Sequence, residues 1–244
     1  MIVWESHTIL LVKRGLMISR RRRSTGRSCR NLAERYGAWA LVAGASQGLG
    51  AAYAHSLARR GMNLVLIARR KSLLDELADN LRSNCGVEVR CLAGDLATLD
   101  FLGSLEAECS GLDLGLIVYN ATQAPIGEFV VANREALTRV VDVNVRAQVE
   151  LLRSLLPGML SRGRGGVILM TSLAGNQGAP RLAAYAASKA FLGFLLKACG
   201  MSSRIGESTL SPVVPVRFEL QDTKWRQGKT LLEHSIPRKL SRQL

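Results

Sequence analysis

Residues 39–61, WALVAGASQGLGAAYAHSLARRG, combine an apolar run, a glycine-rich turn and a helical pattern. The run WALVA is typical of a strand buried in a parallel sheet. Gly44, Gly48 and Gly50 occupy the turn, and Gly61 closes the helix that follows. Glycines between a first strand and a first helix let the backbone approach a pyrophosphate, which the helix N-terminus stabilises. The stretch therefore predicts a dinucleotide site, although its G-x-x-x-G-x-G spacing differs from the common G-x-G-x-x-G.

The same alternation of strand and helix continues outward from this stretch. Further helices are expected over 71–84, about 98–109, about 133–160 and around Tyr185 and Lys189. Strands are expected at 39–43, 63–68, 87–93, 112–120 and 165–172. Five such units predict an α/β, doubly wound, Rossmann-like parallel sheet in the order 3-2-1-4-5, with helices on both faces.

The end of the second strand distinguishes between two dinucleotides. An NAD site usually places an acidic residue there, whereas this sequence has Arg69, Arg70 and Lys71. A guanidinium pairs with a 2′-phosphate in a bidentate fashion. The alternative is a solvated, basic start of the next helix. We favour NADP over NAD as cofactor, with Arg69 as the better candidate for the phosphate.

Several short motifs occur together in one order: Gly44-Ala45-Ser46-Gln47-Gly48-Leu49-Gly50, Asp95-Leu96, Asn120-Ala121, Asn144, Ser172 and Tyr185-x-x-x-Lys189. Over about 35–196 they resemble the short-chain dehydrogenase/reductase superfamily, in which the serine also lies thirteen positions before the tyrosine. AGAS replaces the usual T-G-x-x and YNAT replaces N-N-A-G, but the matched Gly and Asn are kept. Within this superfamily, the sequence is most similar to the 3-oxoacyl and 17β-hydroxysteroid reductase branch. This resemblance suggests a bulky, lipid-like carbonyl substrate.

This resemblance implies hydride transfer between a nicotinamide and a carbonyl or secondary alcohol, with Asn144, Ser172, Tyr185 and Lys189 as catalytic residues. Residues four apart share a helix face, so Lys189 is expected near the Tyr185 phenol or the ribose. A free phenol has a pKa near 10, and a nearby ammonium favours the phenolate. Tyr185 would exchange a proton with the carbonyl oxygen while Ser172 hydrogen-bonds it. Asn144 would hold a water that links Lys189 to solvent, the alternative being an exposed helix asparagine.

The resemblance also assigns residues to the cofactor. Asp95 would accept the adenine amino group, unless it is an acid at a helix N-terminus. Asn120 would tie the fourth strand to the glycine-rich turn. The full cofactor set is Gly44, Ser46, Gln47, Gly48, Leu49, Gly50, Arg69, Asp95, Leu96, Asn120, Tyr185 and Lys189, with no metal.

Charge and cysteine content constrain the partners. The net charge is +14, but residues 1–37 hold nine basic and two acidic residues and residues 197–244 nine and four. The body is thus nearly neutral, which argues against nucleic acid. Five cysteines without C-x-x-C spacing suggest free thiols in a reducing compartment. Without a good signal peptide or membrane span, we expect a cytoplasmic protein with a small-molecule substrate. Related enzymes are commonly dimers or tetramers.

The two flanks depart from this pattern. Residues 1–34 form a basic extension that we expect to be disordered. Residues 197–244 contain none of the sixth strand, substrate lid and seventh strand that the family has. The genetic code allows a different sequence when the last base of each codon is joined to the first two bases of the next, from Lys197 onward. That shifted reading can encode G-L-W-D-E-L-A-D-R, then G-V-D-V-V-A, and then, after two unspecified positions, A-G-S-I-R-T-P. The hypothesis is a shifted reading frame near 195–197, which leaves the fifth strand as an open edge. A cofactor-binding remnant without turnover is therefore the alternative to an active enzyme.

Overall fold

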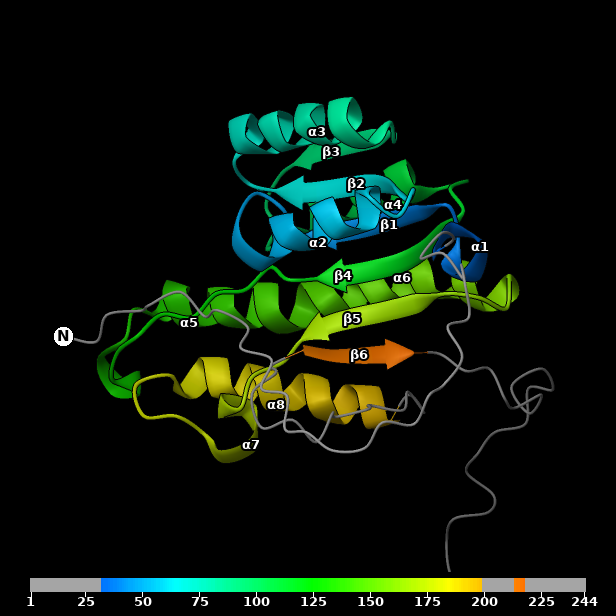
Figure 1. Ribbon diagram of the computed structural model, residues 1–244. Coiled ribbons are helices and arrows are strands. Elements are labelled where there is room, and N and C mark those ends of the chain that lie inside the picture. The colour runs from blue at the N-terminus through cyan, green and yellow to red at the C-terminus, as the bar shows by residue number, and fades with distance from the viewer. Residues whose placement is uncertain (1–31, 199–212, 218–244) are drawn as a thin grey trace, which may run out of the picture.

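The strands form one sheet in the order β3-β2-β1-β4-β5-β6 in the computed structural model, which describes residues 32–198 and 213–217 (Figure 1). The first five strands are parallel, so the predicted order 3-2-1-4-5 is confirmed. Their bounds are β1 Trp39–Ala43, β2 Asn63–Ala68, β3 Val89–Ala93, β4 Leu114–Tyr119, β5 Gly166–Met170 and β6 Val213–Arg217.

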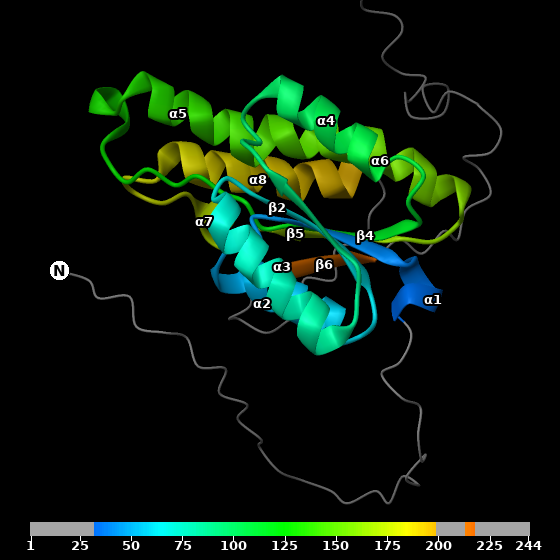
Figure 2. The same ribbon diagram turned by 90° about the horizontal axis from the view of Figure 1, so that it is seen from above.

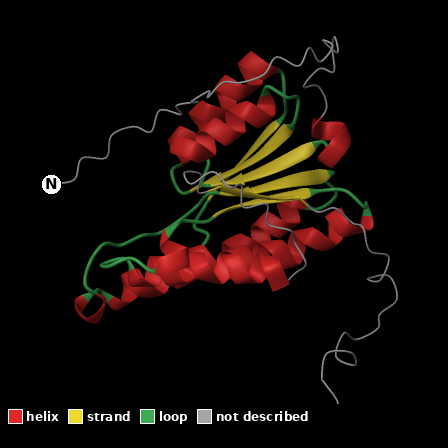
Figure 3. Cartoon of the chain, turned by 60° about the horizontal axis from the view of Figure 1, so that its bottom comes forward, coloured by secondary structure: helices red, strands yellow, loops and turns green. Residues whose placement is uncertain are grey.

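Helices cover both faces of the sheet (Figures 2 and 3). One face carries α2 and α3, and the other carries α4, α5, α6 and α8. The helical elements are α1 Leu32–Tyr36, α2 Gly48–Ala58, α3 Lys71–Cys85, α4 Leu99–Cys109, η1 Phe129–Val131, α5 Arg134–Val141, η2 Asp142–Arg146, α6 Ala147–Ser161, α7 Ala174–Gln177 and α8 Ala183–Ala198.

The position of β1 at the centre of the sheet explains why its sequence is apolar throughout. Successive side chains of a strand point to opposite faces. Ala40 and Val42 therefore join the core beneath α2 and α3. Trp39, Leu41 and Ala43 join the core beneath α4, α6 and α8. All five residues are buried, as expected for the centre of a sheet covered on both sides.

The helix predicted over 133–160 is interrupted. It consists of α5 and α6 joined by η2, a π-helical turn at 142–146. Two consecutive carbonyls of this turn accept hydrogen bonds from buried side chains: Val143 O from Tyr119 Oη and Asn144 O from Gln148 Nε2, each at 2.7 Å. Such turns within α-helices are frequent at functional sites.

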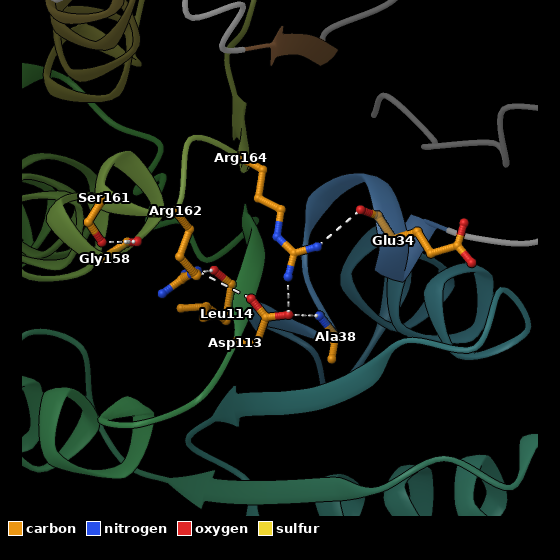
Figure 4. Close-up of polar contacts among 8 residues, drawn as sticks. All are labelled: Glu34, Ala38, Asp113, Leu114, Gly158, Ser161, Arg162 and Arg164. Atoms are coloured by element: carbon orange, nitrogen blue, oxygen red, sulfur yellow. Dashed lines mark hydrogen bonds and ion pairs between the residues drawn. The ribbon is translucent and has the colours of Figure 1, made fainter.

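The Asp113 carboxylate connects the amino ends of three strands through hydrogen bonds and an ion pair (Figure 4). These amino ends lie at the edge of the sheet opposite the glycine-rich turn. Asp113 Oδ2 accepts hydrogen bonds from the Ala38 N–H at 3.0 Å and Arg164 Nη2 at 2.8 Å. Its Oδ1 lies 3.2 Å from Arg162 Nε. Arg164 also donates to the carbonyl of Glu34 in α1 at 3.1 Å. This network joins the starts of β1, β4 and β5 to α1.

The structure differs from two expectations about the flanks. The helix α1 starts at Leu32, so the folded unit begins before the predicted boundary at 35. The expectation of an open edge at β5 is wrong, because β6 pairs antiparallel with it, from Met170↔Val213 to Gly166↔Arg217. An unpaired edge offers free N–H and C=O groups, and valine-rich VVPVR suits a strand. Apart from 197–198 and β6, the tail predicted over 197–244 lies outside the described residues, as does the extension over 1–31.

Candidate active site

The glycine-rich turn is held against two neighbouring elements. Gly44 has φ +80°, and a Cβ there would lie 2.7 Å from the Ala121 N atom. A Cβ on Gly50 would lie 2.0 Å from the Gly44 carbonyl oxygen. Asn120 Nδ2 donates to that same oxygen at 3.2 Å, which confirms the predicted tie between β4 and the turn. Both glycines are required by close backbone approach.

A cleft of about 520 Å³ opens at the carboxyl ends of β1 to β4. The strand order reverses between β1 and β4, and ligands of doubly wound sheets bind at such a point. Nine of the predicted cofactor residues line it: Gly44, Ser46, Gln47, Gly48, Leu49, Arg69, Asp95, Leu96 and Asn120. Gly50 lies beneath the turn, and Tyr185 and Lys189 are not among the lining residues.

Two exposed arginines stand at the end of β2, and both line this cleft. Arg70 Nη2 donates to Ser46 Oγ of the glycine-rich turn at 3.1 Å. Arg69 contributes to the field that stabilises the Asp95 carboxylate. The cleft therefore has guanidinium groups where the sequence predicts a 2′-phosphate, and Arg70 is the one in contact with the turn.

Asp95 is engaged by the protein itself. Its partial burial opposes ionisation, but a hydrogen bond from the Ala97 N–H at 3.0 Å and an ion pair with Arg139 outweigh this, and the pKa of Asp95 lies below its ordinary value. The alternative of a helix N-terminal acid does not hold, because α4 starts at Leu99 with Thr98 as its N-cap residue. Arg139 was not predicted; it lies 44 residues from its partner, and no local pattern signals such a contact.

Tyr185 and Lys189 meet as predicted on α8. The Lys189 Nζ atom lies 5.5 Å from the centre of the Tyr185 ring and donates to the Met170 carbonyl at 2.7 Å. Lys189 is 4% exposed, and burial lowers its pKa to about 8. Because Met170 ends β5, the pair lies at the carboxyl edge of the sheet.

Ser172 follows β5 by two residues, at the same edge of the sheet. Its half-buried Oγ accepts a hydrogen bond from the Ala174 N–H at 3.2 Å. Ala174 begins α7, a short helix that the sequence analysis did not predict. The convergence of Ser172 and Tyr185 on one substrate oxygen stays a prediction.

Asn144 is fully buried, so the alternative of an exposed helix asparagine is wrong. Its Oδ1 accepts from the Gln123 N–H at 2.8 Å and Thr122 Oγ1 at 3.3 Å. Its Nδ2 donates to the Gln123 carbonyl at 2.8 Å and to Ser188 Oγ at 3.1 Å. The side-chain amide thereby uses all four of its hydrogen-bonding positions. It joins the loop after β4 to the helix that carries Tyr185.

Other kinds of site find no support in the part of the chain that the structure describes. It contains no group of His, Cys, Asp and Glu side chains placed to hold a metal ion. Its three cysteines, Cys85, Cys91 and Cys109, are unpaired thiols. None of its helices combines the length and apolar character needed to cross a bilayer.

Comparison with known proteins agrees with this geometry. Residues 38–207 match the family described as short chain dehydrogenase. The chain is 36% identical over 162 residues to a 7beta-hydroxysteroid dehydrogenase of Clostridium sardiniense, covering 66% of this chain and 62% of the relative. It is 33% identical over 164 residues to the very-long-chain 3-oxoacyl-CoA reductase of Mus musculus, covering 66% and 53%.

A solved structure is similar over the same part. A short-chain dehydrogenase from Sphingobium yanoikuyae in complex with NADPH superposes with a TM-score of 0.64 at 35% identity, covering 66% of this chain and 64% of the other. The chain thus spans between half and two thirds of the length of these relatives. On the family match, the shared fold and the arrangement of its motifs, the chain belongs to the short-chain dehydrogenase/reductase family of NAD(P)-dependent oxidoreductases.

Proposed function

We propose that the chain binds NADP(H) in the cleft and transfers hydride between the nicotinamide and a carbonyl or secondary alcohol. The observation that carries this is the Tyr185–Lys189 pair at the edge of the sheet where the glycine-rich turn also lies. The residues present fit a dinucleotide phosphate, because Gly48 lines the cleft at the start of α2 with open space where a Cβ would lie. The N-terminus of α2 adds free N–H groups, and Arg69 and Arg70 add positive charge.

The nicotinamide would supply or accept the hydride. In reduction, Tyr185 gives its phenolic proton to the carbonyl oxygen, and in oxidation it removes the alcohol proton. The Lys189 ammonium, fixed on the Met170 carbonyl, stabilises the phenolate that remains. Ser172 donates a hydrogen bond to the same oxygen and so lowers the energy of the charge that develops there.

A bulky, lipid-like carbonyl is the proposed substrate class. It rests on the names of the relatives, a 7beta-hydroxysteroid dehydrogenase and very-long-chain 3-oxoacyl-CoA reductases. The test is to purify the full chain, titrate it with NADPH, and follow NADPH oxidation with a steroid ketone, a long-chain 3-oxoacyl thioester and a ketose. Oxidation that depends on either of the first two supports the proposal.

A second candidate function is cofactor binding without turnover. The residues that line the cleft all lie between Gly44 and Val143, and none comes from α8. In this case NADPH binds in the same titration, but no carbonyl accelerates its oxidation. Failure to bind NADPH at all would contradict both candidates.

Replacing Arg69 with alanine should weaken NADPH binding about 10–100-fold and leave NADH binding unchanged. Hydrogen bonds to a charged group contribute about 1.5–3 kcal/mol, and only NADPH carries the 2′-phosphate. The measurement is the Kd for each nucleotide by isothermal titration calorimetry. Arg59→Ala is a matched control, since this exposed arginine follows α2 and donates to the His55 carbonyl. Equal losses for NADH and NADPH would rule out a phosphate contact.

The rate of carbonyl reduction should fall as the pH rises through about 8. Burial lowers the pKa of Lys189 to about 8, and a lysine is cationic only below its pKa. The ammonium that stabilises the phenolate is therefore present near neutral pH and lost above that value. The kcat for reduction, measured from about pH 7 to about pH 9, reports this loss. Lys189→Arg stays cationic throughout, so any rate that it keeps should not show the decline.

A further inference from the structure

Gln148 is a buried polar residue to which the proposed mechanism gives no role. It lies in the first turn of α6, is 1% exposed, and its Nε2 donates to the Asn144 carbonyl at 2.7 Å. Its Oε1 is buried and has no hydrogen-bond donor among the described residues. An unsatisfied buried polar atom costs about 1–3 kcal/mol. An apolar side chain of similar size would avoid that cost, so the amide is poorly explained by stability.

The orientation of this amide is fixed by its neighbour. Exchanging its nitrogen and oxygen would place two acceptors, Oε1 and the Asn144 carbonyl, against each other at 2.7 Å. The nitrogen must therefore face Asn144, and the oxygen remains unsatisfied. The amide thus holds the backbone of η2 at the residue whose side chain joins the loop after β4 to α8.

A continuous chain of hydrogen bonds leads from this contact to the tyrosine. Asn144 Nδ2 donates to Ser188 Oγ at 3.1 Å, and Ser188 Oγ donates to the Tyr185 carbonyl at 2.7 Å. Gln148, Asn144 and Ser188 are all buried. Their positions are therefore fixed by one another and by packing rather than by solvent.

We propose that Gln148 is a positioning residue for the reaction under "Proposed function", on which this inference rests. Its amide fixes Asn144 from the backbone side, and Asn144 with Ser188 fixes the turn of α8 that carries Tyr185. It touches neither substrate nor cofactor. Its contribution is to keep the phenol in the geometry from which it transfers a proton.

The test compares Gln148→Met with Leu152→Met, a swap of similar size at a buried position one turn further along α6. Gln148→Met should lower kcat about tenfold, with an unchanged KM for NADPH and little change in Tm, because the loss of the hydrogen bond to the Asn144 carbonyl is offset by removal of the unsatisfied Oε1. Leu152→Met should leave kcat unchanged. If Gln148→Met keeps the wild-type kcat, or loses kcat only together with Tm, the residue has a packing role and the proposal fails.

A double-mutant cycle tests the connection to α8. If Gln148 and Ser188 act through one chain of bonds, Gln148→Met combined with Ser188→Ala should be no slower than the slower single variant. Multiplied losses would show independent roles and overturn the proposal.

Hydrogen exchange of backbone amides tests the positioning role of Gln148 without any need for enzymatic turnover. Failure of this inference can therefore be told apart from failure of the proposed function. If the unaltered chain shows no turnover, the proposed function fails, but the positioning chain can still be measured. Gln148→Met should then speed exchange of the backbone amides in 183–195, and Leu152→Met should not. Unchanged exchange in Gln148→Met would overturn the structural part of the proposal.

Discussion

Replacing Tyr185 with phenylalanine should lower the rate of carbonyl reduction about 10²–10⁴-fold, the usual contribution of a positioned general acid or base. The variant lacks only the hydroxyl, so the ring beside Lys189 and the packing of α8 should remain. The Kd for NADPH should stay within about twofold, because the residues that line the cleft come from Gly44 to Val143. Single-turnover kinetics with saturating NADPH measure the chemical step.

Tyr53→Phe is the matched control for this experiment. Tyr53 is a half-buried residue of α2 that packs against the core beneath α2 and α3. Its hydroxyl has no part in the proposed chemistry, so its loss should leave the rate unchanged. If Tyr185→Phe turns over at the wild-type rate, the proton comes from another group and the proposed mechanism is wrong. The buried Tyr119 is a poor candidate, because its hydroxyl donates to the Val143 carbonyl and burial raises its pKa.

Replacing Gly50 with alanine should abolish most NADPH binding and destabilise the fold by about 1–3 kcal/mol, as overpacking does. In a helix this change is ordinarily stabilising by about 0.5–1 kcal/mol. Here the new Cβ would lie 2.0 Å from the Gly44 carbonyl oxygen, so the backbone of the turn must move. That oxygen also accepts the Asn120 hydrogen bond, which the movement disrupts. We expect a loss of NADPH affinity of at least about tenfold, measured by calorimetry, and a lower midpoint in urea.

Gly103→Ala separates this clash from the general effect of glycine substitution. Gly103 lies on α4, and a Cβ there would meet nothing within 4 Å. Its replacement should stabilise the protein by about 0.5–1 kcal/mol and leave NADPH binding unchanged. If Gly50→Ala behaves like Gly103→Ala, the close approach of α2 to the turn does not limit the site.

The sequence predicts well those features that depend on residues close together in the chain. Unbroken apolar runs mark β1 and β4, and all their residues are buried between two layers of helices. The glycine-rich turn is recognisable because its glycines fall between an apolar run and a helical pattern, and Gly50 is required by the nearby Gly44 carbonyl. The pairing of Tyr185 with Lys189 follows from their spacing of one helical turn.

Features that depend on contacts across the fold are not visible in such patterns. The helix over 133–160 has regular apolar spacing, yet η2 interrupts it where the buried Asn144 reaches the loop after β4. The polar role of Gln148 depends on its distance to one carbonyl, which periodicity does not report. In the sequence, Arg139 is indistinguishable from a surface residue of the predicted helix. Its ion pair with Asp95 exists only because the fold places α5 beside the loop that carries Asp95. These residues were missed because tertiary packing, and not local preference, places them.

The antiparallel direction of β6 links the two ends of the neighbouring strand β5 in a way that the parallel strands do not. Val213 pairs with Met170 near Lys189, whereas Arg217 pairs with Gly166, close to the network around Asp113. A strand advances about 3.4 Å per residue, so Arg217 lies about 14 Å from Val213 along the strand. The backbone of β6 therefore runs from the edge of the sheet that holds Lys189 to the edge where Asp113 joins the strands, opposite to the direction of the five parallel strands.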